Sequence, residues 1–81
     1  MTEIELKGVI CDKFLNGDHE FPIELDTRLL DEGICDSLGL VQLAAEIEKR
    51  AGVRIHDQDI THDNFGTIRA MLGFLEGARS R

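Results

Sequence analysis

The spacing of apolar residues after Asp36 constrains this chain more than any other feature of its sequence. If Asp36 is the N-cap of a helix, the residues that fall on one side of that helix are all apolar: Leu40, Leu43, Ala44, Ile47 and Ala51. The pattern predicts an amphipathic helix from Ser37 to about Arg50, with Gly52 after its C-terminus. The opposite side begins with Leu38, so a large apolar residue is expected in solvent beside Ser37.

Apolar spacing predicts two further main helices and one short one. In residues 4–15 the buried set is expected to be Val9, Ile10 and Phe14. In the last helix Thr67 serves as the cap, and the inward stripe is Ile68, Met71, Leu72 and Leu75. A short helix is expected over residues 57–64, and residues 53–56 are read as a pinned loop. Residues 77–81 are expected to fray.

A long connection, residues 19–35, separates the first two helices. Its apolar residues are spaced so that they can hold it against the helices: Phe21, Ile23, Leu25, Leu29 and Leu30. We expect one turn of helix over residues 27–30.

The length of 81 residues leaves room for one domain, residues 1–81, with one small core. The helix pattern predicts an all-α fold, a small four-helix bundle with a long loop between helices one and two. A cleft for a multi-step reaction is hard to build at this size, so we expect no enzyme.

The charge of the chain excludes several classes of partner. There are 16 acidic and 9 basic side chains, and the net charge is −7. Nucleic acid and anionic membranes are repelled, whereas partners with basic patches are favoured. The sequence shows neither a long apolar run nor a leader pattern, so a cytoplasmic monomer without nucleic-acid or membrane partners is expected.

Several residues invite chemical interpretations that the sequence does not support. Cys11 and Cys35 lack zinc-ligand spacing and a nearby base, and are expected to be buried apolar residues. Around Ser37 a hydrolase elbow would need glycine two residues before it, where Cys35 stands. A calcium loop starting at Asp57 lacks its glycine and final glutamate. His19, His56 and His62 are expected in solvent, and no metal site is predicted.

The residues Asp36, Ser37 and Leu38, followed by GLVQL and a charged helix end, resemble the attachment motif of the acyl and peptidyl carrier proteins. The tail ITHDNFGTIRAMLGFL is also similar to the end of a carrier domain, so the resemblance covers nearly the whole chain. It implies that a phosphopantetheinyl transferase moves 4′-phosphopantetheine from coenzyme A onto Ser37. The thiol of this arm would hold an acyl or aminoacyl group as a thioester. A helix N-terminus favours the phosphate of such an arm.

The resemblance also implies roles for the neighbours of Ser37. Asp36 and Leu38 would contact the transferase, and Val41 would lie near the base of the arm. The partner-facing residues would be Leu38, Gln42, Ala45, Glu46, Glu48 and Lys49. On the opposite edge, Ile55, His56 and Ile60 would border a groove for the cargo.

The second helix is less acidic than in carriers of fatty acid synthesis, because Gln42 and Lys49 stand where acidic residues are common. We therefore favour a free-standing carrier for a dedicated polyketide, nonribosomal peptide or aminoacyl pathway. Its partners would be a separate acyl- or aminoacyl-adenylating ligase and downstream acyl-accepting enzymes. A carrier of the general fatty acid synthase remains an alternative. Another is an unmodified helical interaction module that docks through its acidic loop and Leu38.

Overall fold

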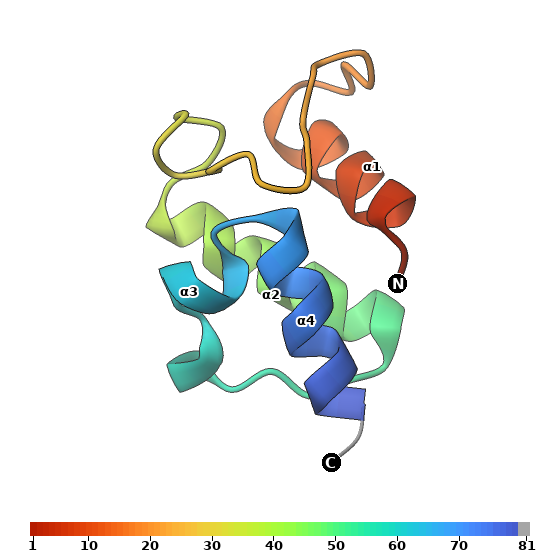
Figure 1. Cartoon of the computed structure of the whole chain (residues 1–81), viewed down its shortest axis with the longest axis vertical. Coiled ribbons are helices and arrows are strands. Elements are labelled where there is room, and N and C mark those ends of the chain that lie inside the picture. Colours follow the sequence, from red (N-terminus) through yellow and green to blue (C-terminus); the bar gives the residue numbers. More distant parts are fainter. Residues whose placement is uncertain (80–81) are drawn as a thin grey trace.

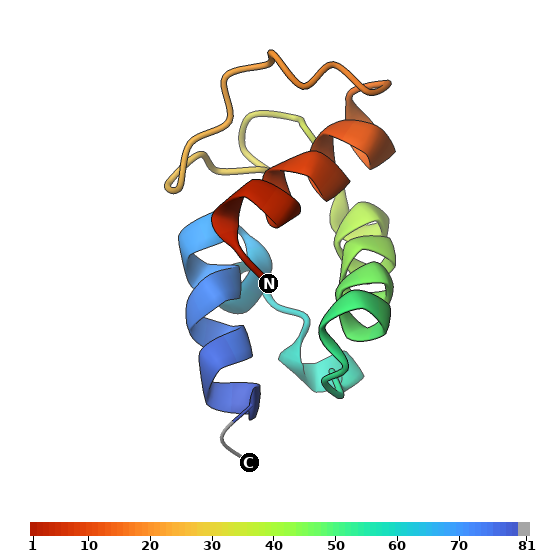
Figure 2. The same ribbon diagram turned by 90° about the vertical axis from the view of Figure 1, so that its right-hand side faces the viewer.

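Four α-helices make up most of the regular structure in the computed structural model, which describes residues 1–79 (Figure 1). They are α1 (Glu3–Phe14), α2 (Ser37–Ala51), α3 (His62–Phe65) and α4 (Ile68–Arg79), with a 3₁₀ turn at Asp57–Asp59 before α3. Helix α1 packs against both α2 and α4, which lie on opposite sides of the molecule below it (Figure 2), and α3 packs against α4. The all-α bundle with a long loop between α1 and α2 is the predicted fold.

The helices begin and end at residues suited to those places. Helix α1 starts with a capping box, in which Thr2 and Glu5 each accept a backbone hydrogen bond from the other. Asp36 is the N-cap of α2, as predicted, and Gly52 ends this helix in the left-handed region with φ 70°. The Thr67 hydroxyl accepts a hydrogen bond from the Ala70 N–H at 3.1 Å, which confirms its capping role.

The core is built from the predicted sides of the main helices. On α2 Leu40, Leu43, Ala44 and Ile47 are buried as predicted, whereas Ala51 is half-buried; on α4 Ile68, Met71 and Leu75 are buried as predicted, whereas Leu72 is half-buried. Two residues of the prediction for α1 are confirmed, Val9 and Ile10, whereas Phe14 is only half-buried. The buried set of α1 also contains Leu6 and Cys11, because the α1 side that faces the core is wider than the predicted one. Phe65 of α3 is fully buried.

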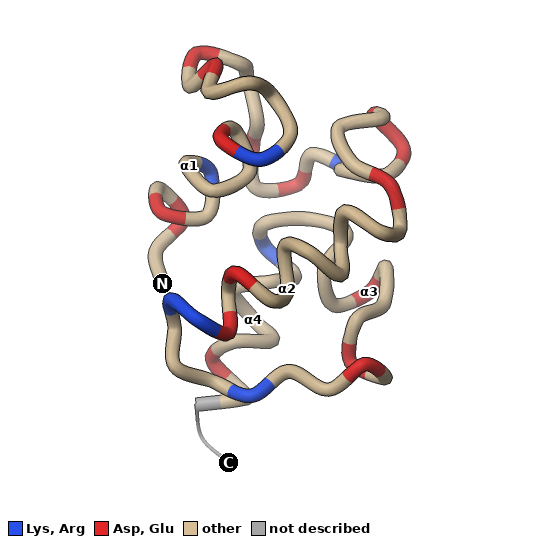
Figure 3. Tube along the Cα trace, turned by 180° about the vertical axis from the view of Figure 1, so that it is seen from behind, with Lys and Arg blue, Asp and Glu red and all other residues tan. Residues whose placement is uncertain are grey.

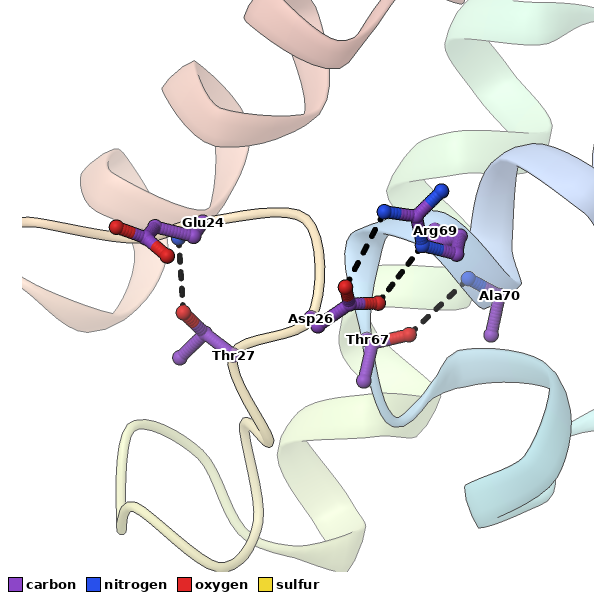
Figure 4. A network of polar contacts seen from close by, with 6 residues as sticks. All are labelled: Glu24, Asp26, Thr27, Thr67, Arg69 and Ala70. Atoms are coloured by element: carbon purple, nitrogen blue, oxygen red, sulfur yellow. Dashed lines mark hydrogen bonds and ion pairs between the residues drawn. The ribbon is translucent and has the colours of Figure 1, made fainter.

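The loop between α1 and α2 carries many of the acidic residues (Figure 3) and is fixed to α4 by polar contacts (Figure 4). Arg69 donates two side-chain hydrogen bonds to Asp26, at 2.7 and 3.1 Å, and its backbone N–H bonds to the Leu25 carbonyl at 3.0 Å. The Leu29 N–H bonds to the Gly66 carbonyl at 3.0 Å. Of the apolar residues expected to hold the loop, Ile23 and Leu29 are buried and Leu25 and Leu30 are partly buried, whereas Phe21 is exposed.

The helical turn predicted over residues 27–30 lies instead over residues 28–32, where the Glu32 N–H bonds to the Arg28 carbonyl at 2.9 Å without continuing into a helix. The Thr27 hydroxyl accepts a hydrogen bond from the Glu24 N–H, and the Leu29 N–H reaches across to Gly66, so these groups do not bond along a helix. Hydrogen-bonded turns follow over residues 29–33, and Gly33 has a positive φ of 71°.

The predicted short helix over residues 57–64 is divided in two, Asp57–Asp59 and His62–Phe65. Thr61 is extended between them and caps α3 by accepting from the Asn64 N–H, while the Asn64 side chain donates to the Asp59 carbonyl at 2.9 Å. Ile60, between the two parts, is half-buried. At the other end, α4 continues to Arg79, so the fraying predicted from Gly77 is wrong up to that residue. Residues 80–81 of that prediction lie outside the described chain.

Candidate functional site

Ser37 is exposed at the first position of α2, where the helix start is fixed by its neighbour. The Asp36 carboxylate accepts a hydrogen bond from the Gly39 N–H at 2.7 Å, and the Asp36 carbonyl accepts from the Leu40 N–H at 3.0 Å. The N–H groups of Ser37 and Leu38 precede these bonds, at the positive end of the helix dipole. Helix α2 has no acidic residue in its first turn. The hydroxyl thus stands where an attached anion is stabilised.

Two large apolar residues follow Ser37 on the exposed side of α2. Leu38 is 64% exposed and Val41 is 46% exposed. The prediction that Leu38 faces solvent is therefore confirmed. Gln42, Ala45 and Lys49 continue the same side of the helix and are also exposed.

Glu46 is half-buried and enclosed by cations. Its carboxylate lies 2.7 Å from Arg50 Nε and 3.9 Å from Lys13 Nζ of α1. The hydrogen bond from Arg50 lowers the pKa of Glu46, with smaller contributions from the charges of Arg50 and Lys13. Glu46 therefore stays ionised, and the positive charges of Arg50 and Lys13 balance its negative charge.

Two of the residues expected to face partners are turned toward the protein itself. The half-buried Glu48 carboxylate accepts a hydrogen bond from the Ile55 N–H at 2.6 Å. Ile55 is only 7% exposed and belongs to the core. Of the other residues expected on that edge, His56 is exposed and Ile60 half-buried. The structure thus leaves only part of the expected edge accessible.

An open hollow of about 700 Å³ adjoins Ser37 on the side of α1 and the preceding loop. The side chains that line it include Phe14, Leu30, Ile34, Leu38 and Gln42. Sequence reasoning did not connect Phe14, Leu30 or Ile34 with Ser37. Their apolar character within an acidic, glycine-containing segment was the available signal, but the loop path that brings them together depends on long-range hydrogen bonds.

Gly39 allows the end of α1 to approach the start of α2. A Cβ atom at Gly39 would lie 3.0 Å from both Cys35 Cβ and Phe14 Cε1, which is tighter than ordinary contact. Because Gly39 has no side chain, Phe14 can lie close to α2 and form part of the wall of the hollow beside Ser37.

The sequence profile of a family described as the phosphopantetheine attachment site matches residues 5–75. The chain belongs to this family. It is 32% identical to the D-alanyl carrier protein of Enterococcus faecalis over 62 aligned residues. The alignment covers 76% of this chain and 80% of that protein. It is also 33% identical over 55 residues to the D-alanyl carrier protein of Bacillus cereus strain B4264, covering 68% of this chain and 70% of the relative.

The site geometry fits the family's prosthetic group, 4′-phosphopantetheine. An accessible hydroxyl, a helix N-terminus for a phosphate and an adjoining hollow with apolar walls occur together. The hollow has a volume in the range typical of small-molecule sites, about 300–1,000 Å³.

The two cysteines and three histidines considered as reactive groups have ordinary environments. Cys11 and Cys35 are both unpaired and buried, as predicted. Burial raises the pKa of each thiol, and the nearby charge of Asp36 raises that of Cys35 further, so neither resembles an activated nucleophile. His19 pairs with Asp12 at 2.7 Å on the surface, and His56 and His62 are exposed as predicted.

Within residues 1–79, no three or more His, Cys, Asp or Glu side chains are arranged to hold a metal ion. Over the same residues, no helix has the length and apolar character needed to cross a membrane.

Proposed function

We propose that Ser37 carries 4′-phosphopantetheine and that this carrier protein holds an aminoacyl group for a dedicated pathway. The observation that carries the proposal is the exposed Ser37 hydroxyl at the capped start of α2, inside the segment matched by the attachment-site family. When bound, the group supplies a thiol on a flexible arm, which holds an acyl or aminoacyl group as a thioester. The protein contributes no reactive group beyond the Ser37 hydroxyl.

Attachment requires the Ser37 oxygen to form one new bond. The oxygen attacks the phosphorus that bears the pantetheine part of coenzyme A, and the adenosine bisphosphate leaves. The Ser37 proton passes to a base of the phosphopantetheinyl transferase, which also holds the magnesium ion. The first-turn N–H groups of α2 then stabilise the phosphodiester by about 0.3–1 kcal/mol.

The neighbours of Ser37 divide into residues that position it and residues that face partners. Asp36 fixes the helix start, and Leu38 and Val41 present apolar surface at the base of the arm. Gln42, Ala45 and Lys49 extend the accessible surface, as do His56 and part of Ile60 at the other edge. Glu46, Glu48 and Ile55 have internal partners, so we assign them to the support of this surface.

The proposed cargo is D-alanine or a similar small amino acid. The D-alanyl carrier proteins among the relatives support it. The low acidity of the exposed side of α2 argues against a carrier of the general fatty acid synthase. The partners would be a ligase that adenylates the amino acid, an enzyme that accepts it from the thioester, and the phosphopantetheinyl transferase. All three would meet this protein in the cytoplasm, where it acts as a monomer.

The attachment is tested by intact mass. Incubation with coenzyme A, magnesium and a broad-specificity transferase should add the mass of one phosphopantetheine to the wild-type chain. Ser37→Ala should gain nothing, whereas Ser80→Ala, which removes the other serine of the chain, should gain the group normally. A wild-type chain that never gains the group would leave the unmodified interaction module as the better interpretation.

The cargo needs a second experiment on the modified protein. With ATP and a D-alanine-adenylating ligase, the holo-protein should gain the mass of one alanyl residue, and mild hydroxylamine should remove it because thioesters are cleaved. Loading only by a malonyl transferase would instead indicate a carrier of fatty acid or polyketide synthesis.

A further inference from the structure

The hollow beside Ser37 lies on the α1 side of the first turns of α2. Its walls come from the end of α1, from the loop before α2 and from α2 itself. Figure 2 shows the end of α1 above the start of α2. On α2, Leu38 and Gln42 line the hollow one helical turn apart, whereas Val41 between them does not. A group attached to Ser37 can therefore turn toward α1 and the loop, or away from them.

Four large apolar side chains line the hollow. Phe14 and Leu30 are half-buried, and Leu38 is 64% exposed. Ile34 is nearly buried, at 8% exposed. The first three side chains thus keep apolar surface in contact with solvent. A ligand that covered this surface would be stabilised by removing it from water.

The polar groups of the hollow suit an uncharged ligand that contains amides. The Gln42 side chain is exposed, and within residues 1–79 it makes no hydrogen bond to another protein group. Its amide offers one acceptor and two donors. The charged residue of the lining, Asp36, already accepts a hydrogen bond from the Gly39 N–H. Apolar walls with a few polar groups are the usual composition of a small-molecule site.

The opposite edge, where the sequence predicts a groove for the cargo, offers less apolar surface. Ile55 is a core residue, and its N–H is bonded to the Glu48 carboxylate. Of the other two residues expected there, His56 is polar and exposed, and Ile60 is half-buried. The apolar surface available near Ser37 therefore lies mainly on the α1 side.

We propose that, in the protein free of partner enzymes, the phosphopantetheine arm turns toward α1 and rests in this hollow. This inference rests on the proposed attachment at Ser37. The attachment selects the occupant, because Ser37 itself lines the hollow and a tethered group has a high effective concentration there. Phe14, Leu30 and Leu38 pack against the methyl groups of the arm, and Gln42 bonds to one of its amides. Since the hollow is open, enzymes can still withdraw the arm.

The test locates the arm by NMR. Isotope-labelled apo-protein is converted with unlabelled coenzyme A and a phosphopantetheinyl transferase, so that only the arm lacks the label. Isotope-filtered NOE spectra then show which protein protons lie near the arm. The arm methyls should give NOEs to Phe14, Leu30 and Leu38. The NOE is the suitable readout because it requires proximity, whereas chemical shifts near Ser37 also respond to the charge of the added phosphate.

Two variants with matched controls test the walls of the hollow. Leu30→Ala is compared with Leu72→Ala, which changes another half-buried leucine, on α4 and outside the hollow. The first should lose the NOEs between the arm and Phe14, and the second should keep them. Gln42→Ala is compared with Gln58→Ala, since both glutamines are exposed. Only Gln42→Ala should weaken the same NOEs.

Thermal melting shows whether each variant is folded. Because the Gln42 side chain has no internal hydrogen bond to lose, Gln42→Ala keeps the test available if Leu30→Ala unfolds. If the folded variants retain the NOEs of the wild type, the hollow does not hold the arm and the proposal is overturned.

Two results for the wild type would also overturn it. NOEs to His56 and Ile60 in place of Phe14 and Leu30 would put the arm at the opposite edge. NOEs confined to Ser37 and its chain neighbours would mean that the arm moves freely in solvent. Neither result affects the attachment, which intact mass establishes beforehand. A wild-type chain that never gains the group refutes the attachment at Ser37, and the resting place with it.

Discussion

The carboxylate of Glu48 accepts a hydrogen bond from the backbone N–H of Ile55 at 2.6 Å, which ties the last turn of α2 to the segment after Gly52. The bond is partly buried, and Ile55 is itself a core residue. Hydrogen bonds to a charged group are worth more than neutral ones, about 1.5–3 kcal/mol. The residue that sequence reasoning assigned to partners thus has a structural role.

Glu48→Ala should lower the free energy of unfolding by about 1–2 kcal/mol, because the Ile55 N–H loses its acceptor. Urea denaturation followed by circular dichroism measures this change. Glu48→Gln, which keeps a carbonyl acceptor, should lose less. The exposed neighbour provides the control, since Lys49→Ala should stay within about 0.5 kcal/mol. Equal losses in Glu48→Ala and Lys49→Ala would show that the hydrogen bond contributes nothing.

The ion pair between Asp26 and Arg69 predicts a pH dependence of the loop attachment. The hydrogen bond from Arg69 lowers the pKa of Asp26 in the folded protein. A lowered folded-state pKa stabilises the protein above the ordinary carboxyl pKa of about 4, and this contribution is lost as the pH falls through the lower folded value. Both groups are exposed, so the contribution is modest.

Arg69→Ala should therefore return the pKa of Asp26 toward its ordinary range, as followed by NMR titration of the side-chain carboxyl. The melting temperature of this variant should fall below that of the wild type at neutral pH, and the difference should disappear in strong acid. Arg54→Ala removes another exposed arginine and should leave the Asp26 titration unchanged. A difference in melting temperature that persists at all pH values would contradict the ion-pair account.

Two glycines at the C-terminal end of the chain should respond oppositely to alanine. A Cβ atom at Gly66 would collide with the His62 carbonyl oxygen, whereas one at Gly73, within α4, would meet nothing within 4 Å. Gly66→Ala should cost about 1–3 kcal/mol of unfolding free energy, because backbone at the α3–α4 junction must shift. Gly73→Ala should add about 0.5–1 kcal/mol, because alanine favours the helix. Chemical denaturation of both variants measures these changes in unfolding free energy. If Gly66→Ala stabilised the protein, the collision would be refuted.

The main helices could be predicted from the sequence because their signals are local. Apolar spacing, the Asp36 cap and Gly52 define α2 within the chain's own near neighbours, and the structure agrees. The same holds for Thr67 at the start of α4. These features depend on interactions between residues three or four positions apart, which a single sequence displays directly.

The features that differ from the sequence predictions depend on contacts between segments far apart in the chain. The path of residues 24–33 is set by hydrogen bonds to Gly66 and Arg69, and these partners cannot be read from local spacing. The same long-range path forms the hollow beside Ser37, so Phe14 and Leu30 were not recognised as its walls. Likewise, Leu38, Gln42, Ala45 and Lys49 are exposed as predicted, but Glu46 of the same side is half-buried against Lys13 of α1, and the inward turn of Glu48 depends on the loop that follows the helix.

Leu38 and Leu43 lie on opposite sides of α2, so replacing each with alanine makes the same chemical change in two different environments. Leu38 is 64% exposed beside Ser37, and Leu43 is fully buried at 0%. Leu43→Ala should cost about 2–5 kcal/mol of unfolding free energy because it leaves a cavity, whereas Leu38→Ala should change stability by less than about 0.5 kcal/mol.

The transfer of phosphopantetheine should show the reverse order. Leu38→Ala removes an apolar anchor next to the reacting hydroxyl and should lower kcat/KM for modification by about five- to twentyfold, consistent with truncation of a contact residue worth 1–2 kcal/mol. Leu43→Ala, measured at a temperature where it remains folded, should be modified at nearly the wild-type rate, because Leu43 is buried away from any partner. Urea denaturation and intact-mass kinetics on the same preparations provide both quantities. A large loss of stability in Leu38→Ala would mean that the rate effect arises from unfolding, and it would contradict the exposed position of Leu38 from which its docking role is inferred.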